Sequence, residues 1–239
     1  MLAERLASHG IAVIAADHSP NTLFDVWNQT FDSVNASMLD TRVADVRYAL
    51  DLALDPSAYA LPAELRGHFD AAHVGAFGHS FGALTTGRIL QEDQRVLAGL
   101  AVAAPLSSPM PGGPDLSLVA KPMLLILAKE DGSIFEIGNQ FIRNNFKAAP
   151  GPAWLLEVAD AGHFSFSDIP GLDSEFQPGC GPATRQTDGT AFTFVDPAKT
   201  RELAAQVVAR YFAKFLLQRP GAMDHLADAL SAAASVQQK

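Results

Sequence analysis

Short, continuous runs of apolar residues recur along this chain and alternate with stretches that have helical character. Such runs are typical of strands that are buried on both faces, as in a parallel sheet covered by helices. The predicted strands are residues 11–16, 73–77, 97–103, 123–128 and 153–158. Because strands that alternate with helices form βαβ units, the sequence predicts an α/β fold with a mostly parallel sheet and helices on both faces.

The predicted helices lie between these runs and near the end of the chain. We expect them over residues 1–9, 39–54, 81–90, 134–146 and 197–217. A long loop rich in glycine, proline and aspartate is predicted over 160–196, and the tail over 221–239 is predicted to be helical or frayed. The length of 239 residues and the lack of a linker-like composition predict a single domain over 1–239.

Composition excludes several classes of function. The chain has 17 Lys+Arg against 26 Asp+Glu, a net charge of −9 without a basic cluster, so nucleic-acid binding is not expected. Cys180 is the only cysteine, which excludes an internal disulfide and argues against a Cys/His metal site. The apolar runs are far shorter than the ~20 residues that span a bilayer, so no membrane span is expected. No segment assigns a compartment, and localisation is left open.

The motif Gly78-His79-Ser80-Phe81-Gly82 lies between a predicted strand and a predicted helix. G-x-S-x-G in this position is typical of a nucleophile elbow, a sharp turn that raises a serine above the carboxyl ends of the strands. We expect both glycines to remove bulk that would collide across the turn. The N–H of Phe81 at the start of the helix is a candidate oxyanion donor. A tight turn with an incidental serine is the alternative.

A serine nucleophile needs a base that is oriented by an acid, and for this elbow the chain order is Ser, Asp or Glu, then His. Asp131 follows the predicted strand 123–128 and is the candidate acid, with the adjacent Glu130 as its competitor. His163 follows the predicted strand 153–158 and is the candidate base. The alternatives are a solvated carboxylate at a strand end and a histidine in a surface loop.

Several other residues are candidates to border a substrate. His18 lies in a predicted strand-end loop, and Trp27 and Phe164 are candidate pocket walls because small-molecule sites are mostly apolar. The same applies to Phe24, Phe31 and Phe81. Core packing is the alternative for each aromatic residue. We expect the side chain of His79 to point away from Ser80 and to serve in packing or hydrogen bonding.

With these residues in place, the sequence resembles the α/β-hydrolase superfamily. More narrowly, it resembles the bacterial relatives of platelet-activating-factor acetylhydrolase and the dienelactone hydrolase-like serine esterases. The stretches that carry the resemblance are LAERLASHGIAVIAADHSPNT, TRVADVRYALD, VGAFGHSFGALTT, KPMLLILAKEDGS and AGHFSFSDI. The resemblance implies hydrolysis of carboxylic esters with short or modified acyl groups, without a cofactor or a metal. It also implies that Ser80, Asp131 and His163 form the catalytic triad.

The sequence departs from these relatives in three ways. Eukaryotic acetylhydrolases take their acid from the loop after the preceding strand, but residues 101–105 hold no carboxylate, which favours Asp131. Dienelactone hydrolases have a cysteine where this chain has Ser80. The superfamily also has a strand before the helix matching 1–9, and its His-Gly-type turn supplies the other oxyanion N–H. Either the true start lies upstream and this fold is N-terminally truncated, or residues 11–16 pair directly beside 73–77.

The predicted function is therefore a serine hydrolase of carboxylic esters that acts through an acyl-enzyme. Short-chain acyl esters and the acetyl esters of phospholipids are the expected substrates, with lipid degradation as the setting. An active thioesterase, amidase or polyester hydrolase is one alternative. A catalytically impaired fragment that serves as a binding or dimerisation module is another. We expect a small-molecule ester or lipid as the partner, and homo-oligomer formation is left open.

Overall fold

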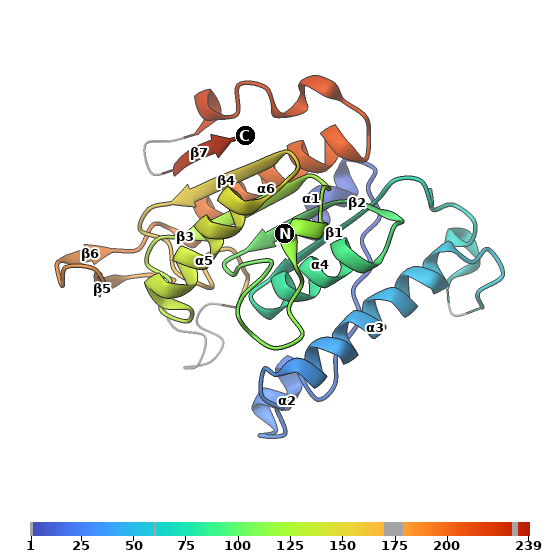
Figure 1. Ribbon diagram of the computed structural model, residues 1–239, viewed down its shortest axis with the longest axis horizontal. Helices are drawn as coiled ribbons and strands as arrows, with labels where there is room; N and C mark the ends of the chain where they lie inside the picture. Colours follow the sequence, from blue (N-terminus) through green and yellow to red (C-terminus); the bar gives the residue numbers. More distant parts are fainter. Residues whose placement is uncertain (1, 60, 170–178, 231–233) are drawn as a thin grey trace.

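The computed structural model describes residues 2–59, 61–169, 179–230 and 234–239 (Figure 1). Its centre is a five-stranded sheet with the strand order β1-β2-β3-β4-β7. The strands from β1 to β4 are parallel, and β7 pairs antiparallel with β4. The bounds are Val74–His79 (β1), Val96–Val102 (β2), Met123–Ala128 (β3), Ala153–Val158 (β4) and Ala234–Gln238 (β7). This is the mostly parallel sheet that the sequence predicts.

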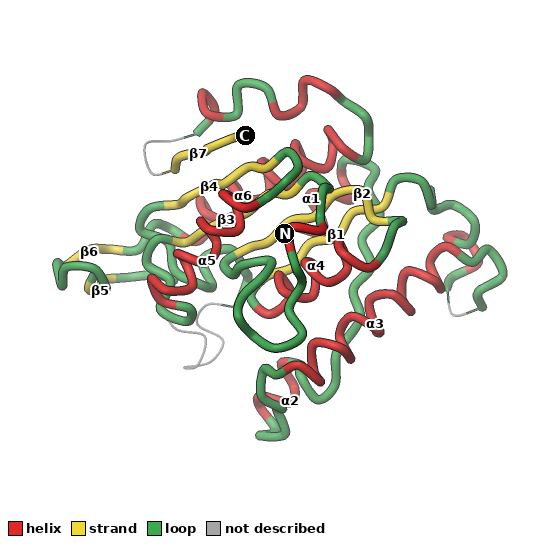
Figure 2. The backbone as a smooth tube through the Cα atoms, in the orientation of Figure 1, coloured by secondary structure: helices red, strands yellow, loops and turns green. Residues whose placement is uncertain are grey.

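Helices cover both faces of the sheet (Figure 2). One face packs against α1 (Leu2–Ser8) and α6 (Pro197–Phe215). The other packs against α4 (Phe81–Glu92), α5 (Phe135–Ala148) and the outer helix α3 (Ala36–Leu54). Successive strand residues alternate between the two cores, with Leu100, Leu124, Ile126 and Leu156 in the first and Ala101, Leu125, Leu127 and Leu155 in the second. Both cores are apolar, which is why these strands read as continuous apolar runs.

Most predicted elements are confirmed. The strands predicted over 123–128 and 153–158 coincide with β3 and β4, and β1 and β2 differ from their predictions only at the ends. Helix α3 begins earlier than predicted, because Oδ1 of Asn35 accepts a hydrogen bond from the N–H of Met38 at 2.9 Å and caps the helix. Helix α6 begins at Pro197 as predicted, with Asp196 as its N-cap.

A short helix, α2 (Leu23–Trp27), interrupts the region before α3 in which the sequence shows little periodicity. Thr22 and Asp25 form a capping box at its start. The N–H of Asp25 donates to Oγ1 of Thr22 at 3.2 Å, and the carboxylate of Asp25 accepts from the N–H of Thr22 at 2.8 Å. The spacing of these two residues is the sequence signal for this helix.

The prediction of a strand over residues 11–16 is wrong, because this run forms no ladder with any described strand. Ile11 and Val13 pack against the core on the α1–α6 side, whereas Ile14 is 50% exposed. Contact with that core accounts for Ile11 and Val13, but not for the exposed Ala12, Ile14 and Ala15. The arrangement in which 11–16 pairs beside 73–77 is wrong for the same reason, since β2 is the only described strand that pairs with β1.

Two further predictions differ from the structure. The segment 160–196, predicted as a loop, contains a hairpin of β5 (Pro182–Thr184) and β6 (Ala191–Thr193) that projects beside the sheet (Figure 1). The part of that loop at 170–178 lies outside the described residues. The tail, predicted to be helical or frayed, has short 3₁₀ turns at Pro220–Met223 and Ala227–Ala229 and then forms β7. Pairing with the edge of β4 overrides the helix propensity of this alanine-rich segment.

Candidate active site

Ser80 lies on a sharp turn between β1 and α4. Its backbone has φ 55° and ψ −124°, a sparsely populated conformation for a residue with a side chain. Such a conformation costs about 1–3 kcal/mol and persists only where the surrounding fold imposes it. Here the N–H of Ser80 donates to the carbonyl of Val102 at the end of β2, at 2.9 Å. The turn is thereby held at the carboxyl end of the parallel strands.

Only the first glycine of the elbow motif is required by packing. A Cβ atom on Gly78 would lie 2.1 Å from the backbone oxygen of Gly82, a distance that the chain cannot accommodate. A Cβ atom on Gly82 would meet Nη2 of Arg42 at 3.9 Å, which is ordinary contact. The expectation that both glycines remove bulk is therefore confirmed for Gly78 and wrong for Gly82.

Asp131 and His163 converge on Ser80 from two other strand ends. Nε2 of His163 lies 2.8 Å from Oγ of Ser80, and Nδ1 of the same ring lies 2.8 Å from Oδ2 of Asp131. Ser80 follows β1, Asp131 follows β3 and His163 follows β4. Three parallel strands therefore bring these side chains together at the carboxyl end of the sheet. Both distances are those at which a proton can pass from a hydroxyl to an imidazole that a carboxylate orients.

The carboxylate and the imidazole are both buried. Asp131 is 1% exposed and His163 is 2% exposed. The second carboxylate oxygen of Asp131, Oδ1, accepts hydrogen bonds from the N–H groups of Ser133 at 2.9 Å and Ile134 at 3.0 Å. The competitor Glu130 makes a different contact, with Oε1 2.5 Å from Nη1 of Arg185. Of the two adjacent acids, Asp131 is the one that contacts the histidine.

His79 contacts the backbone of His163. Its Nε2–H donates to the carbonyl oxygen of His163 at 2.8 Å, and the two ring centroids are 4.8 Å apart. Burial disfavours the charged imidazolium, and the neighbouring His163 adds to this effect, so the pKa of His79 is lowered to about 4. His79 is therefore neutral at pH 7. The sequence predicts a packing or hydrogen-bonding role for this residue but does not reveal its acceptor.

Phe81 begins α4, so its N–H has no acceptor within the helix and is available to a ligand oxygen. The guanidinium carbon of Arg42 lies 5.1 Å from the centroid of the Phe81 ring. Nη1 of Arg42 donates to Oδ1 of Asn21 at 2.8 Å, and its Nε donates to Oγ1 of Thr85 at 3.3 Å. Arg42 therefore joins the loop before α2 to the elbow, a contact that the sequence does not indicate.

The three residues predicted to bind substrate lie in different surroundings. The ring of Phe164 is 4.8 Å from that of His163, centroid to centroid. Nδ1 of His18 lies 2.8 Å from Oδ2 of Asp45 on α3, and Trp27 is 47% exposed at the end of α2. Within the described part of the chain, no hydrogen bond or ring contact joins His18 or Trp27 to Ser80, Asp131 or His163. The other candidate aromatics of this loop, Phe24 and Phe31, are also exposed.

The described ranges contain no group of three or more His, Cys, Asp or Glu side chains arranged to hold a metal ion. In the same ranges, no helix combines the length and the hydropathy that crossing a bilayer requires.

Comparison with solved structures finds a similarity to a ferulic acid esterase from Streptomyces cinnamoneus, with 25% sequence identity and a TM-score of 0.61. The match covers 84% of this chain and 55% of the esterase, so the chain spans about half the length of that protein. No family model and no curated protein matches the sequence. The similarity supports an α/β-hydrolase-type fold and does not single out the acetylhydrolase or dienelactone hydrolase relatives. The mostly parallel sheet with helices on both faces is thus an α/β-hydrolase-type architecture.

Proposed function

We propose that this protein is a serine hydrolase that cleaves carboxylic esters. The observation that carries the proposal is the unbroken series of contacts from Asp131 through His163 to Ser80, with 2.8 Å at each of the two links. The strained backbone of Ser80 at the head of a helix supports the same reading. The similarity to a ferulic acid esterase is consistent with this class of reaction.

In the proposed reaction, Oγ of Ser80 attacks the ester carbonyl carbon while Nε2 of His163 takes the hydroxyl proton. The oxyanion of the tetrahedral intermediate accepts a hydrogen bond from the N–H of Phe81. Collapse of the intermediate expels the alcohol, which receives the proton from His163. Water then attacks the acyl-enzyme with His163 again as the base, which releases the acid and restores Ser80. Asp131 keeps the other imidazole proton on Nδ1 throughout.

The proposed substrates are esters with short acyl groups, including the acetyl esters of phospholipids. Esters of aromatic acids form a second group, because the structurally similar esterase acts on ferulic acid esters according to its name. A serine triad does not fix the leaving group, so thioesters and polyesters belong to the same set of tests. Phe164 offers an apolar surface beside the imidazole for any of these acyl groups.

Turnover of p-nitrophenyl acetate, butyrate and octanoate, together with methyl ferulate, tests the proposal. We expect Ser80→Ala to lower kcat by at least about 10⁴-fold, as removal of the nucleophile does in serine hydrolases. Ser117→Ala, at an exposed serine in a 3₁₀ turn, is the matched control and should retain the wild-type rate. Wild-type turnover by Ser80→Ala would refute the assignment.

Labelling by a fluorophosphonate probe separates the proposal from its main alternative. A competent site should form a covalent adduct, and peptide mapping should find it on Ser80. A folded protein that neither reacts with the probe nor hydrolyses any ester in the panel would favour the binding or dimerisation module. The oligomeric state measured by light scattering would then be the next observation to make.

A further inference from the structure

The β5–β6 hairpin lies against the two loops that carry Asp131 and His163. We call residues 129–134 the acid loop and residues 159–165 the base loop. The side chain of Arg185, which directly follows β5, reaches both loops. Its Nη1 lies 2.5 Å from Oε1 of Glu130 in the acid loop, and its Nη2 lies 2.6 Å from Oδ1 of Asp160 in the base loop. One guanidinium therefore bridges the loops that follow two different strands.

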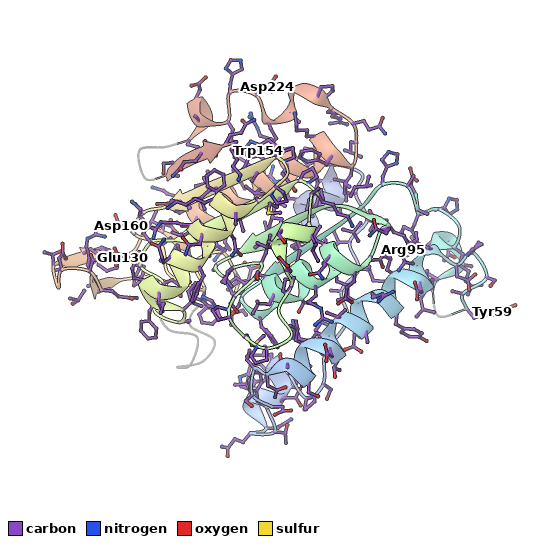
Figure 3. All side chains as sticks on the ribbon, in the orientation of Figure 1. Tyr59, Arg95, Glu130, Trp154, Asp160 and Asp224 are labelled. Carbon is purple, nitrogen blue, oxygen red and sulfur yellow. The ribbon has the colours of Figure 1, made fainter. Side chains whose placement is uncertain are left out.

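A second side chain of the hairpin contacts the acid loop directly. Nε2 of Gln186 donates to the backbone carbonyl of Asp131 at 2.8 Å. On the other side of the hairpin, the N–H of Val195 donates to the carbonyl of Asp160 at 2.8 Å. The hairpin and the residues that directly follow it thus contact Asp131 in the acid loop and Asp160 in the base loop. Figure 3 labels Glu130 and Asp160 next to each other beside the hairpin.

The two loops are also joined to each other by the backbone. The N–H of Glu130 donates to the carbonyl of Ala161 at 2.9 Å. The contact between Asp131 and His163 joins the loops a second time, at 2.8 Å, and Arg185 adds a link that comes from outside both loops. Arg185 is placed to influence the spacing between the acid and base loops, because its partners Glu130 and Asp160 lie within three residues of Asp131 and His163 along the chain.

The Glu130 end of the Arg185 bridge is buried, whereas the side chains of Arg185 and Asp160 are partly exposed. Glu130 is 7% exposed, and within the described residues its Oε2 atom has no hydrogen-bond partner. Arg185 itself stacks over the ring of Phe192 in β6, with its guanidinium carbon 4.7 Å from the ring centroid. The two terminal nitrogens of the guanidinium face two carboxylates, Glu130 and Asp160. A lysine ammonium is a point charge and cannot reproduce such a fork.

We propose that the β5–β6 hairpin is a brace that sets the distance between the acid and base loops, with Arg185 as its positioning residue. This inference rests on the proposed function for its catalytic meaning, since it concerns the contact between Asp131 and His163. Arg185 acts through the two loops and touches neither the nucleophile nor the reacting atoms.

Arg185→Met tests the proposal, because it keeps much of the side-chain length and removes the fork. We expect kcat to fall about 10- to 100-fold with a small change in KM, since misplaced catalytic groups slow the chemical step more than they weaken binding. The acidic limb of kcat against pH should also move to lower pH by about one unit, because an imidazolium that loses part of its contact with a carboxylate is less stable.

The direction of this pH shift discriminates between a weakened contact of His163 with Asp131 and the mere loss of the positive charge of Arg185. Removal of a nearby positive charge alone would stabilise the imidazolium and move the limb to higher pH. A shift to higher pH, or no shift, would therefore overturn the proposal, whereas a shift to lower pH supports it. Arg185→Lys should recover the charge without the fork and should retain a shift in the same direction as Arg185→Met.

The double variant Glu130→Gln/Arg185→Met covers the case in which Arg185→Met does not fold. It leaves no buried unpaired carboxylate, so folding should be recovered, but the bridge between the loops is still absent. We expect it to keep the lowered kcat and the shift to lower pH. Recovery of the wild-type kcat and pH profile would mean that Arg185 only neutralises Glu130, and would overturn the brace.

Arg95→Met is the matched control. Arg95 also bridges two carboxylates, Asp93 at 2.6 Å and Asp51 at 2.6 Å, and Asp93 is 5% exposed. This bridge lies at the start of β2, at the opposite end of the parallel strands, and Figure 3 shows Arg95 on the side of the molecule away from Glu130 and Asp160. We expect Arg95→Met to lose stability while kcat and the pH profile stay unchanged.

A titration of the His163 ring by NMR makes this test independent of the proposed function. The midpoint of the titration should move to lower pH in Arg185→Met and stay in place in Arg95→Met, whether or not any ester is hydrolysed. If the wild-type protein shows no turnover but the titration shifts as expected, the proposed function fails and the brace stands. If the wild-type protein is active and the titration does not shift, the brace alone fails.

Discussion

Nε2 of His79 lies 2.8 Å from the backbone carbonyl oxygen of His163. His79 directly precedes Ser80, and the ring of His163 contacts the hydroxyl of Ser80. The elbow and the base loop are therefore connected twice, once through the Ser80 hydroxyl and once through this hydrogen bond. The carbonyl oxygen can only accept, so Nε2 of His79 carries the proton. The hydrogen bond thus also defines the tautomer of His79.

Loss of this hydrogen bond should slow the proposed reaction. We expect His79→Phe, which keeps an aromatic ring and removes the donor, to lower kcat about 2- to 10-fold, the equivalent of one net hydrogen bond. KM should change little, because the contact holds the base and not the substrate. Steady-state kinetics with p-nitrophenyl acetate measure both constants. His79→Gln retains an N–H donor and should recover part of the loss; equal kcat in all three proteins would contradict the role.

The lowered pKa of His79 predicts how stability depends on pH. An imidazole with a pKa of about 4 in the folded protein and about 6.5 in the unfolded chain binds its proton more readily when unfolded. The contribution of His79 to the free energy of unfolding is fully present above pH 6.5 and is lost as the pH falls from 6.5 towards 4. The amount is about 3 kcal/mol of unfolding free energy.

Urea unfolding of the wild type and His79→Phe at pH 7, 5.5 and 4.5 measures this contribution. The wild type should lose stability relative to His79→Phe as the pH is lowered, because the phenyl ring does not titrate. A constant difference between the two proteins across this range would show that His79 is not held neutral by burial.

Asp131→Asn should abolish most of the proposed activity without unfolding the protein. An asparagine can present an N–H to Nδ1 of His163 and so favour the wrong tautomer, a change that costs about 10⁴-fold in kcat in serine proteases. Asp93→Asn is the matched control, since Asp93 is also a buried, hydrogen-bonded carboxylate but lies at the far end of the strands. A comparable loss of kcat in both variants would mean that the effect is one of stability.

The two elbow glycines should respond differently to alanine. In Gly78→Ala the new Cβ would overlap the backbone of Gly82, so we expect a loss of about 1–3 kcal/mol in unfolding free energy or a failure to fold. In Gly82→Ala the Cβ has room, and alanine within a helix is favoured over glycine by up to about 1 kcal/mol. Urea denaturation of both variants gives the comparison; equal destabilisation would contradict the packing difference.

The sequence by itself determines the strands β3 and β4 and the elbow at Ser80. A strand buried on both faces is apolar at nearly every position, which is a property of the strand alone. Residues 123–128, and 153–158 apart from the partly exposed Glu157, can therefore be recognised without their neighbours. The glycine of the elbow motif is likewise local, because a side chain at Gly78 would collide with the backbone of Gly82, four residues along the chain. The order of Ser80, Asp131 and His163 along the chain then limits the candidates for a triad to a few residues.

Only the tertiary structure decides which segments pair and which side chains meet. Residues 11–16 are apolar yet pair with no described strand, whereas 234–238 form β7 because the folded chain places them beside β4. The choice of Asp131 over Glu130 depends on where His163 lies in space. Arg185 lies 55 residues from Glu130 and 25 from Asp160 along the chain, and contacts over such separations follow from the packed fold and leave no periodic signal in the sequence.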